Sequence, residues 1–130
     1  TNVPGASTYY MGSITAYAYE AKVRLLSVRW ETLEQHGAVS PETVLEMARG
    51  VRVALAADIG MAVSGIAGPG GGTPEKPVGL TCIGLSTPLH EQSWSFVWSG
   101  DRRQNKEQSA DAVLRLLVEY LRQHATETIL

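Results

Sequence analysis

Hydrophobic and polar positions follow two different spacings along this chain, which predicts strands interleaved with helices. Residues 9–17 are rich in aromatic and β-branched side chains, a composition that favours a strand. Apolar positions three and four residues apart then predict a short helix over 18–28 and a helical continuation over 31–36. Gly37 is expected to end this first helical region.

A stronger helix signal follows at Ser40, Pro41 and Glu42. Serine caps a helix N-terminus well, proline fits the first helical position, and an acidic side chain is stabilised near the positive end of the helix dipole. Apolar residues continue at helical spacing beyond this start, and the pattern predicts a helix that ends near Asp58.

The second half of the chain predicts three strands and a long helix. A short buried strand at 61–64 precedes a glycine-rich segment, and strands over 80–86 and 91–98 are joined by a hairpin connection. The last element, 105–124, is an amphipathic helix. Its expected apolar face consists of Ala110, Val113, Leu114, Leu117, Tyr120 and Leu121. The second hairpin strand places Trp94, Phe96 and Trp98 on one face of the sheet, and we interpret these three aromatic residues as part of the core. Interleaved strands and helices indicate an α/β layered domain with a mixed sheet.

Composition restricts the function classes. With 130 residues, of which 44% are hydrophobic and 18% charged, the chain has material for one domain with a core. A net charge of −2 lacks the basic footprint of a nucleic-acid binder. No apolar run reaches the roughly 20 residues of a membrane helix and no signal segment opens the chain. We therefore expect a cytoplasmic protein without a nucleic-acid or membrane partner.

Cysteine and histidine usage argues against a metal centre. The single Cys82 excludes a disulfide framework and a multi-cysteine zinc site, and its apolar strand favours a core role. The three histidines are widely separated and form no pair at helical spacing. We expect neither a metal ion nor a cofactor.

Residues 65–79 form a glycine-rich loop directly after a predicted buried strand. Such a loop brings backbone N–H groups onto an anion, or it is only a long connection made of turn-forming residues. The loop does not fit the P-loop, because Lys76 follows Glu75 rather than a glycine. It does not fit the dinucleotide fingerprint either, because the G-x-G-x-x-G register fails across Gly68, Gly70 and Gly72. Both interpretations stay open from the residues alone.

Other candidate residues carry chemistry that a site would need. Tyr17 and Lys22 lie at the predicted strand-to-helix junction, where a lysine acts as a general base only if its pKa is lowered. The alternative is a core tyrosine and a surface lysine. Ser7 lies in a turn, where it is a nucleophile or an ordinary turn residue. Arg102 or Arg103 follows the tryptophan-rich strand and suits a phosphate contact or a charged turn.

Taken in order, several motifs closely resemble the C-terminal domain of the competence/damage-inducible CinA family, which also occurs as a stand-alone nicotinamide-mononucleotide deamidase. The motifs are TNVPGAS from Thr1, Y-x-x-E-A-K from Tyr17, HGAVS from His36, SGIAGPGGGTPEKPVG from Ser64 and SGDR from Ser99. The similarity covers almost the whole chain.

The resemblance implies one three-layer α/β/α domain over residues 1–130, acting as a homodimer on a small nucleotide. It further implies that a Ser/Lys mechanism hydrolyses the carboxamide of nicotinamide mononucleotide, with Lys22 as the catalytic lysine and Tyr17 and Ser7 assisting. The residues matching the substrate-binding positions are Ser64, Gly65, Gly68, Gly71, Gly72, Thr73, Lys76 and Arg102.

Two departures from the family pattern keep alternatives open. The family's nucleophile stretch, Ala-Glu-Ser-Cys-Thr-Gly-Gly, does not occur here, and Ala18 and Tyr19 replace a serine and an asparagine. The chain also begins in a loop without a methionine, so we expect an upstream segment to be missing and its restoration to raise stability. The alternatives are an amidohydrolase domain without its nucleophile segment, a non-catalytic pyridine-nucleotide or phosphate-binding domain, and a structural piece that uses its tryptophan-rich strand as an interface.

Overall fold

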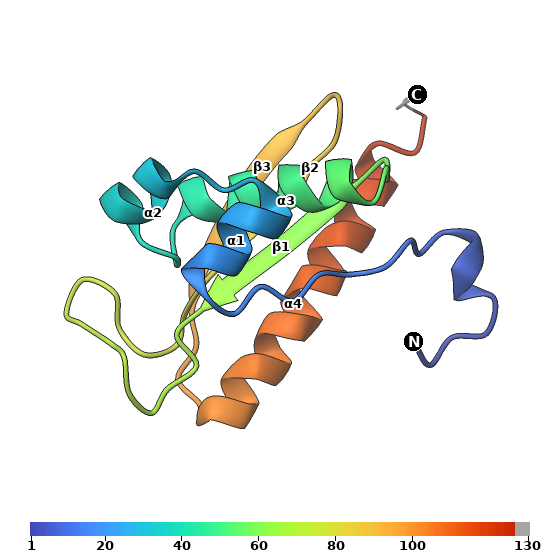
Figure 1. The fold of residues 1–130 in the computed structure, drawn as a ribbon. Helices are drawn as coiled ribbons and strands as arrows, with labels where there is room; N and C mark the ends of the chain where they lie inside the picture. Colours follow the sequence, from blue (N-terminus) through green and yellow to red (C-terminus); the bar gives the residue numbers. More distant parts are fainter. Residues whose placement is uncertain (127–130) are drawn as a thin grey trace.

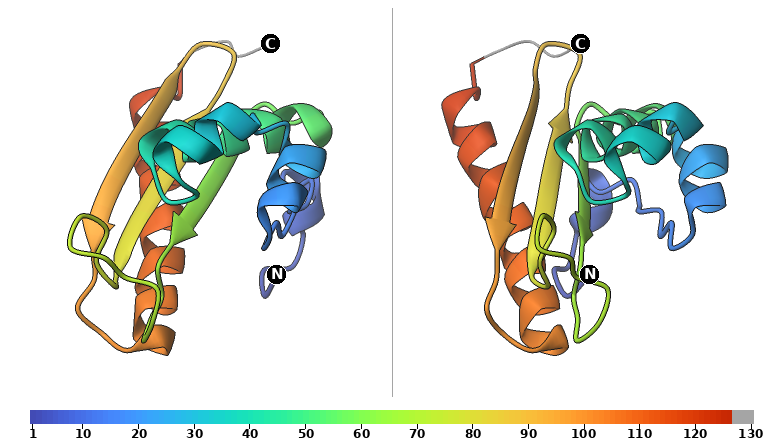
Figure 2. Two further views of the ribbon diagram at one scale, coloured as in Figure 1. Left: turned by 60° about the vertical axis from the view of Figure 1, so that its left-hand side comes forward. Right: turned by 90° about the vertical axis from the view of Figure 1, so that its left-hand side faces the viewer.

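The computed structural model describes residues 1–126 and has three layers (Figure 1). Helix α3 covers one face of a sheet, with α1 and α2 packed against α3, and α4 covers the other face (Figure 2). In chain order the elements are η1 (Ala6–Thr8), α1 (Tyr19–Leu26), α2 (Trp30–His36), α3 (Pro41–Ala54), β1 (Gly60–Gly65), β2 (Leu80–Ser86), β3 (Glu91–Val97) and α4 (Arg102–Gln123). The expected three-layer α/β/α organisation is confirmed.

Within the described residues the sheet is antiparallel rather than mixed. Its order is β1-β2-β3, and Gly84 of β2 lies opposite Ala62 of β1 and Ser93 of β3. Parallel neighbours need a crossover connection, usually a helix. Here a hairpin joins β2 to β3, and the glycine-rich loop leads β1 straight back into β2. The prediction of a mixed sheet was therefore wrong.

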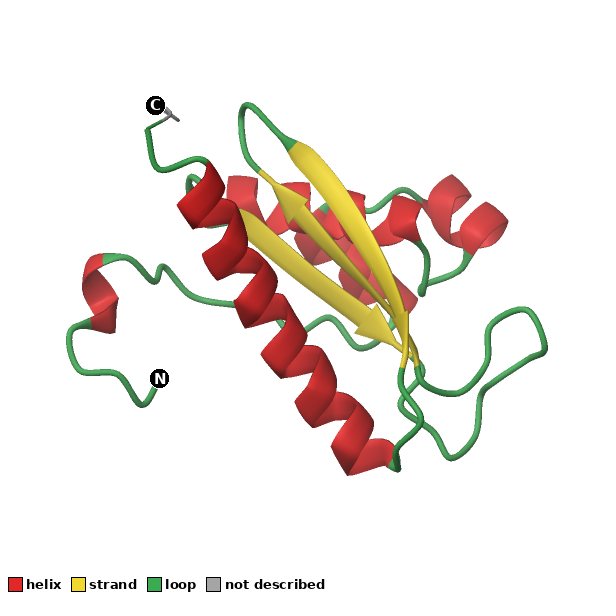
Figure 3. Cartoon of the chain, turned by 180° about the vertical axis from the view of Figure 1, so that it is seen from behind, coloured by secondary structure: helices red, strands yellow, loops and turns green. Residues whose placement is uncertain are grey.

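The predicted strand over residues 9–17 does not form. Residues 10–17 run outside the sheet between η1 and α1 (Figure 3), and Tyr10, Met11 and Tyr17 are exposed. Strand propensity largely expresses packing on a pleated, half-buried surface. No strand in the described part of the chain pairs with this segment, so its aromatic composition alone did not produce a strand.

The helix signals at Ser40 and Pro41 are confirmed. The Ser40 hydroxyl accepts a hydrogen bond from the Thr43 N–H at 3.1 Å, and Pro41 is the first residue of α3. Helix α3 ends at Ala54, before the predicted position. It packs on β1 and β2 and is the centre of the hydrophobic core, where Val44 and Ala48 are fully buried.

The expected apolar face of α4 is confirmed in part, since Tyr120 is buried and Val113 and Leu117 are half-buried, whereas Ala110, Leu114 and Leu121 are exposed. Leu114 and Leu121 are 63% and 44% exposed, whereas Asn105 and Tyr120 are buried. The inward face also includes polar residues near the start of the helix, where Ser109 accepts a hydrogen bond from the Trp98 indole N–H at 2.9 Å. The tryptophan-rich strand correspondingly packs toward α4, with the Phe96 and Trp98 rings stacked at 4.9 Å.

Candidate functional site

The glycine-rich loop leaves β1 at Gly65 and is closed by hydrogen bonds at its base and its tip. At the base, the Ile66 N–H donates to the Leu80 carbonyl at 2.9 Å and the Gly79 N–H donates to the Ile66 carbonyl at 2.7 Å. At the tip, the Thr73 N–H donates to the Lys76 carbonyl at 2.8 Å. The loop is thus a defined structure rather than a loose connection.

Lys76 fastens the outer part of the loop to the helical layer. Its ammonium group donates a hydrogen bond to the His36 carbonyl at the C-terminal end of α2. A cation is favoured there by the helix dipole. Gly37 leaves room for this contact, since a Cβ atom at that position would lie 2.9 Å from the lysine nitrogen. Gly71, Gly72 and Thr73 belong to the exposed part of the same loop.

Arg102 joins the loop to the segment that precedes α1. Its Nη1 atom donates to the Gly68 carbonyl at 3.0 Å, and its Nη2 atom donates to the Tyr17 hydroxyl at 3.4 Å. Arg103 instead pairs with Glu107 along the surface of α4 at 3.0 Å. Of the two arginines that the sequence left open, the structure places Arg102 beside the glycine-rich loop.

Lys22 is buried, with 6% of its surface exposed. Its Nζ atom donates to the Ala16 carbonyl at 2.9 Å and lies 3.5 Å from the Tyr17 carbonyl. Loss of hydration disfavours the charged form, so burial lowers the pKa of the Lys22 ammonium group. Tyr17 itself is 84% exposed. The alternative of a surface lysine and a core tyrosine was therefore wrong for both residues.

The serine candidates lie in different places. Ser64 is half-buried on β1, opposite Cys82 of β2, one residue before the loop begins. Ser7 lies in η1, on the opposite side of the molecule from the glycine-rich loop (Figures 1 and 3). The structure gathers Tyr17, Lys22 and Arg102 around one end of the sheet, but it does not bring Ser7 to them.

One residue at this end of the sheet was missed by the sequence interpretation. Asn105 is 2% exposed, and its side chain bonds to the glycine-rich loop and to the turn before α4. The available signal was a polar side chain four residues before Ser109, on a stripe that faces the sheet. Using that signal requires knowing which face of α4 meets the sheet.

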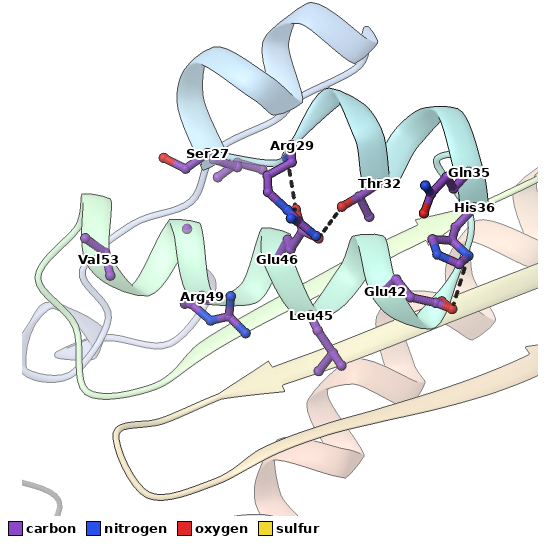
Figure 4. A pocket seen from close by; sticks show the side chains of 12 residues that line it. Ser27, Arg29, Thr32, Gln35, His36, Glu42, Leu45, Glu46, Arg49 and Val53 are labelled. Atoms are coloured by element: carbon purple, nitrogen blue, oxygen red, sulfur yellow. Dashed lines mark hydrogen bonds and ion pairs between the residues drawn. The ribbon is translucent and has the colours of Figure 1, made fainter.

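A separate cleft of about 480 Å³ lies among α1, α2 and α3 (Figure 4). In this cleft the Glu46 carboxylate accepts hydrogen bonds from the backbone N–H of Arg29 at 2.9 Å and from the Thr32 hydroxyl at 2.5 Å. These bonds join the start of α2 to α3. This cleft contains none of the site residues expected from the sequence.

The fold and site define an α/β domain with a buried lysine, an arginine and a glycine-rich loop at one end of its sheet. The CinA C-terminal domain family matches residues 1–121, and the chain belongs to this family. It is 46% identical over 128 residues to a CinA-like protein of Chlorobaculum tepidum, covering 95% of this chain and 30% of that protein. A putative competence-damage inducible protein of Moorella thermoacetica is 47% identical over 122 residues, with coverages of 94% and 30%.

Solved structures agree with this assignment. The competence damage-inducible protein A (ComA) of Klebsiella pneumoniae superimposes with a TM-score of 0.78 at 35% identity, covering 82% of this chain and 66% of that one. A CinA superfamily protein of Escherichia coli gives 0.78 at 27% identity, with coverages of 82% and 62%. The chain thus spans about 30% of the length of the curated relatives and less than two thirds of the Escherichia coli chain. Among the described residues, no helix combines the length and the apolar character that crossing a bilayer requires.

Proposed function

We propose that this domain binds nicotinamide mononucleotide and takes part in hydrolysing its carboxamide to nicotinate mononucleotide and ammonia. The observation that carries the proposal is the burial of Lys22, whose pKa is lowered, beside the backbone of Tyr17. We further propose that it works as a homodimer in the cytoplasm.

In the proposed reaction, the neutral amine of Lys22 accepts the proton of a serine hydroxyl while the serine oxygen attacks the amide carbon. The C–N bond then breaks, and the proton held by the lysine leaves with ammonia. Water hydrolyses the resulting ester, which releases the carboxylate and restores the hydroxyl. A lysine near its ordinary pKa would be protonated at neutral pH and unable to start this sequence, which is why its burial matters.

Arg102 and the glycine-rich loop supply the binding part of the proposal. The guanidinium partners that the structure gives are a carbonyl and a phenol, neither of which carries a negative charge. A phosphate is attracted to such an arginine, which is able to form a bidentate contact with it. Holding the phosphate at a distance from the amide positions the reacting group.

A second candidate function is binding of a pyridine nucleotide without hydrolysis. One observation favours it: Ser7 lies in η1, which is on the opposite side of the molecule from the glycine-rich loop (Figure 1). The two candidates share the binding site and differ only in whether a nucleophile reaches it.

Ammonia release and calorimetric binding of nicotinamide mononucleotide separate these candidates. They are measured for the 130-residue chain and for a version preceded by a segment that carries the nucleophile stretch. We expect both versions to bind the nucleotide and the extended version to release ammonia, with release abolished by Lys22→Met. Binding without turnover in both versions favours the second candidate. Failure of both versions to bind contradicts the proposed function.

A further inference from the structure

Asn105 connects two segments that are far apart in sequence. Its Nδ2 atom donates to the Ala67 carbonyl in the glycine-rich loop at 3.1 Å. Its Oδ1 atom accepts from the Gly100 N–H, in the turn that precedes α4, at 3.0 Å. The residue is 2% exposed, and both bonds are partly buried.

The arrangement requires one side chain to donate and accept at the same time. An amide does both, whereas a carboxylate only accepts and a hydrocarbon does neither. Asparagine also ranks among the weaker helix formers, so its presence on the sheet-facing side of α4 is not explained by helix propensity. Leaving a buried backbone N–H or carbonyl without its hydrogen-bond partner costs about 1–3 kcal/mol. The glycine-rich loop and the turn before α4 therefore both depend on Asn105 for a partner.

The bond to Ala67 lies next to the contact made by Arg102. Gly68, the residue after Ala67, offers its carbonyl to Arg102 at 3.0 Å. Arg102 and Asn105 are three residues apart on α4 and therefore neighbours on the helix surface. Two successive carbonyls of the loop are thus held by the first turn of one helix.

We propose that Asn105 is a positioning residue that fixes the base of the glycine-rich loop against the start of α4 and so sets the placement of Arg102 for an anionic ligand. The choice of ligand rests on the proposed function; the attachment of the loop does not.

Ser109 provides a matched control on the same helix face. Its hydroxyl donates to the Asn105 carbonyl at 2.8 Å and accepts from the Trp98 indole N–H at 2.9 Å. It also lies 3.2 Å from the Thr81 hydroxyl. Ser109→Ala therefore removes partly buried hydrogen bonds from α4 to Trp98 and Thr81 without touching residues 66–72 of the glycine-rich loop.

The test measures amide hydrogen exchange over residues 66–72 and the Kd for nicotinamide mononucleotide. Asn105→Asp retains the acceptor for Gly100 but places a second oxygen against the Ala67 carbonyl. We expect exchange in the loop to become about tenfold faster and the Kd to rise about tenfold, the effect of losing one buried hydrogen bond. Asn105→Ser, which is uncharged and too short to span both partners, gives the same test if Asn105→Asp does not fold.

Ser109→Ala is expected to lower the Tm while leaving loop exchange and Kd unchanged. Unchanged loop exchange in the Asn105 variants, or equal acceleration in Ser109→Ala, overturns the proposal. Faster exchange in the Asn105 variants alone supports the attachment, even if the wild-type chain fails to bind the nucleotide, in which case only the proposed function fails.

Discussion

The guanidinium of Arg102 lies 3.4 Å from the hydroxyl of Tyr17, although 85 residues separate them in sequence. The same side chain donates to the Gly68 carbonyl at 3.0 Å. The start of α1, the glycine-rich loop and the start of α4 therefore meet at one cation. This meeting point gives the proposed nucleotide site its positive charge.

Replacing Arg102 tests that charge. We expect Arg102→Ala to raise the Kd for nicotinamide mononucleotide about tenfold or more, because a hydrogen bond to a charged group contributes about 1.5–3 kcal/mol. Titration calorimetry provides the measurement, and Arg103→Ala is the control, since Arg103 pairs with Glu107 instead. Equal effects of the two substitutions would show that only the overall charge matters.

Burial of Lys22 predicts a specific dependence of stability on pH. The pKa of Lys22 is lowered in the folded chain, so between that value and the unfolded value of about 10.4 the unfolded state binds more protons than the native state. The free energy of unfolding attributable to Lys22 therefore rises with pH through this interval. Lys22→Met should remove that rise in urea unfolding measured at pH 7 and pH 10.

Lys106→Met is the control for this measurement, because Lys106 is exposed on α4. Its substitution should leave the pH dependence as it is in the wild-type chain. An identical pH dependence in Lys22→Met and wild type would mean that the lysine titrates normally.

Local signals predicted much of the fold. Strand β2 was predicted at its observed bounds, and Ser40 and Pro41 correctly marked the start of α3, because caps and hairpins depend on neighbouring residues. The prediction over residues 9–17 failed because a strand depends on a partner elsewhere. The face of α4 was predicted only in part, because the inward positions Asn105 and Ser109 bond to distant segments that no local pattern identifies.

The site was predictable in its residues but not in its geometry. The sequence named Lys22 and both arginines, yet lysines are ordinarily exposed, so its burial was not deducible. Choosing Arg102 over Arg103 requires knowing which side of α4 faces the glycine-rich loop. The contact of Lys76 with the His36 carbonyl likewise joins segments whose approach no local pattern encodes.

A second pH dependence, of the same direction but in the acidic range, involves Glu91. Arg49 donates to both carboxylate oxygens, at 2.9 and 2.6 Å, which joins α3 to β3 and lowers the pKa of Glu91. The stabilisation by the Arg49–Glu91 pair is present above the pKa of about 4.3 that Glu91 has in the unfolded chain. It is lost as the pH falls through the lowered pKa of Glu91 in the folded chain. Glu91→Gln should cost about 1 kcal/mol at pH 7, at the upper end for a partly exposed pair, and less at pH 3.

Urea midpoints at the two pH values measure this difference. Glu107→Gln is the matched control, since its pair with Arg103 lies within one exposed helix face and is expected to contribute at most about 0.5 kcal/mol. A cost of Glu91→Gln that stays constant down to pH 3 would contradict the assignment.

Gly50 allows α1 to approach α3 closely. A Cβ atom at this position would lie 1.8 Å from the carbonyl oxygen of Leu26, the last residue of α1. Glycine-to-alanine changes within helices ordinarily stabilise by about 1 kcal/mol. Here we expect Gly50→Ala to destabilise by about 2 kcal/mol in urea unfolding, because the backbone of α1 has to move away. Gly70→Ala, with no atom within 4 Å of the added carbon, should be nearly neutral.

Helix α1 also carries Lys22, so its displacement has a second consequence. Moving α1 should hydrate the ammonium group and return its pKa toward the ordinary value. The rise in stability between pH 7 and pH 10 should then be smaller in Gly50→Ala than in Gly70→Ala. If Gly50→Ala lowers stability equally at both pH values, the close approach of α1 and α3 supports packing alone and does not maintain the environment of Lys22.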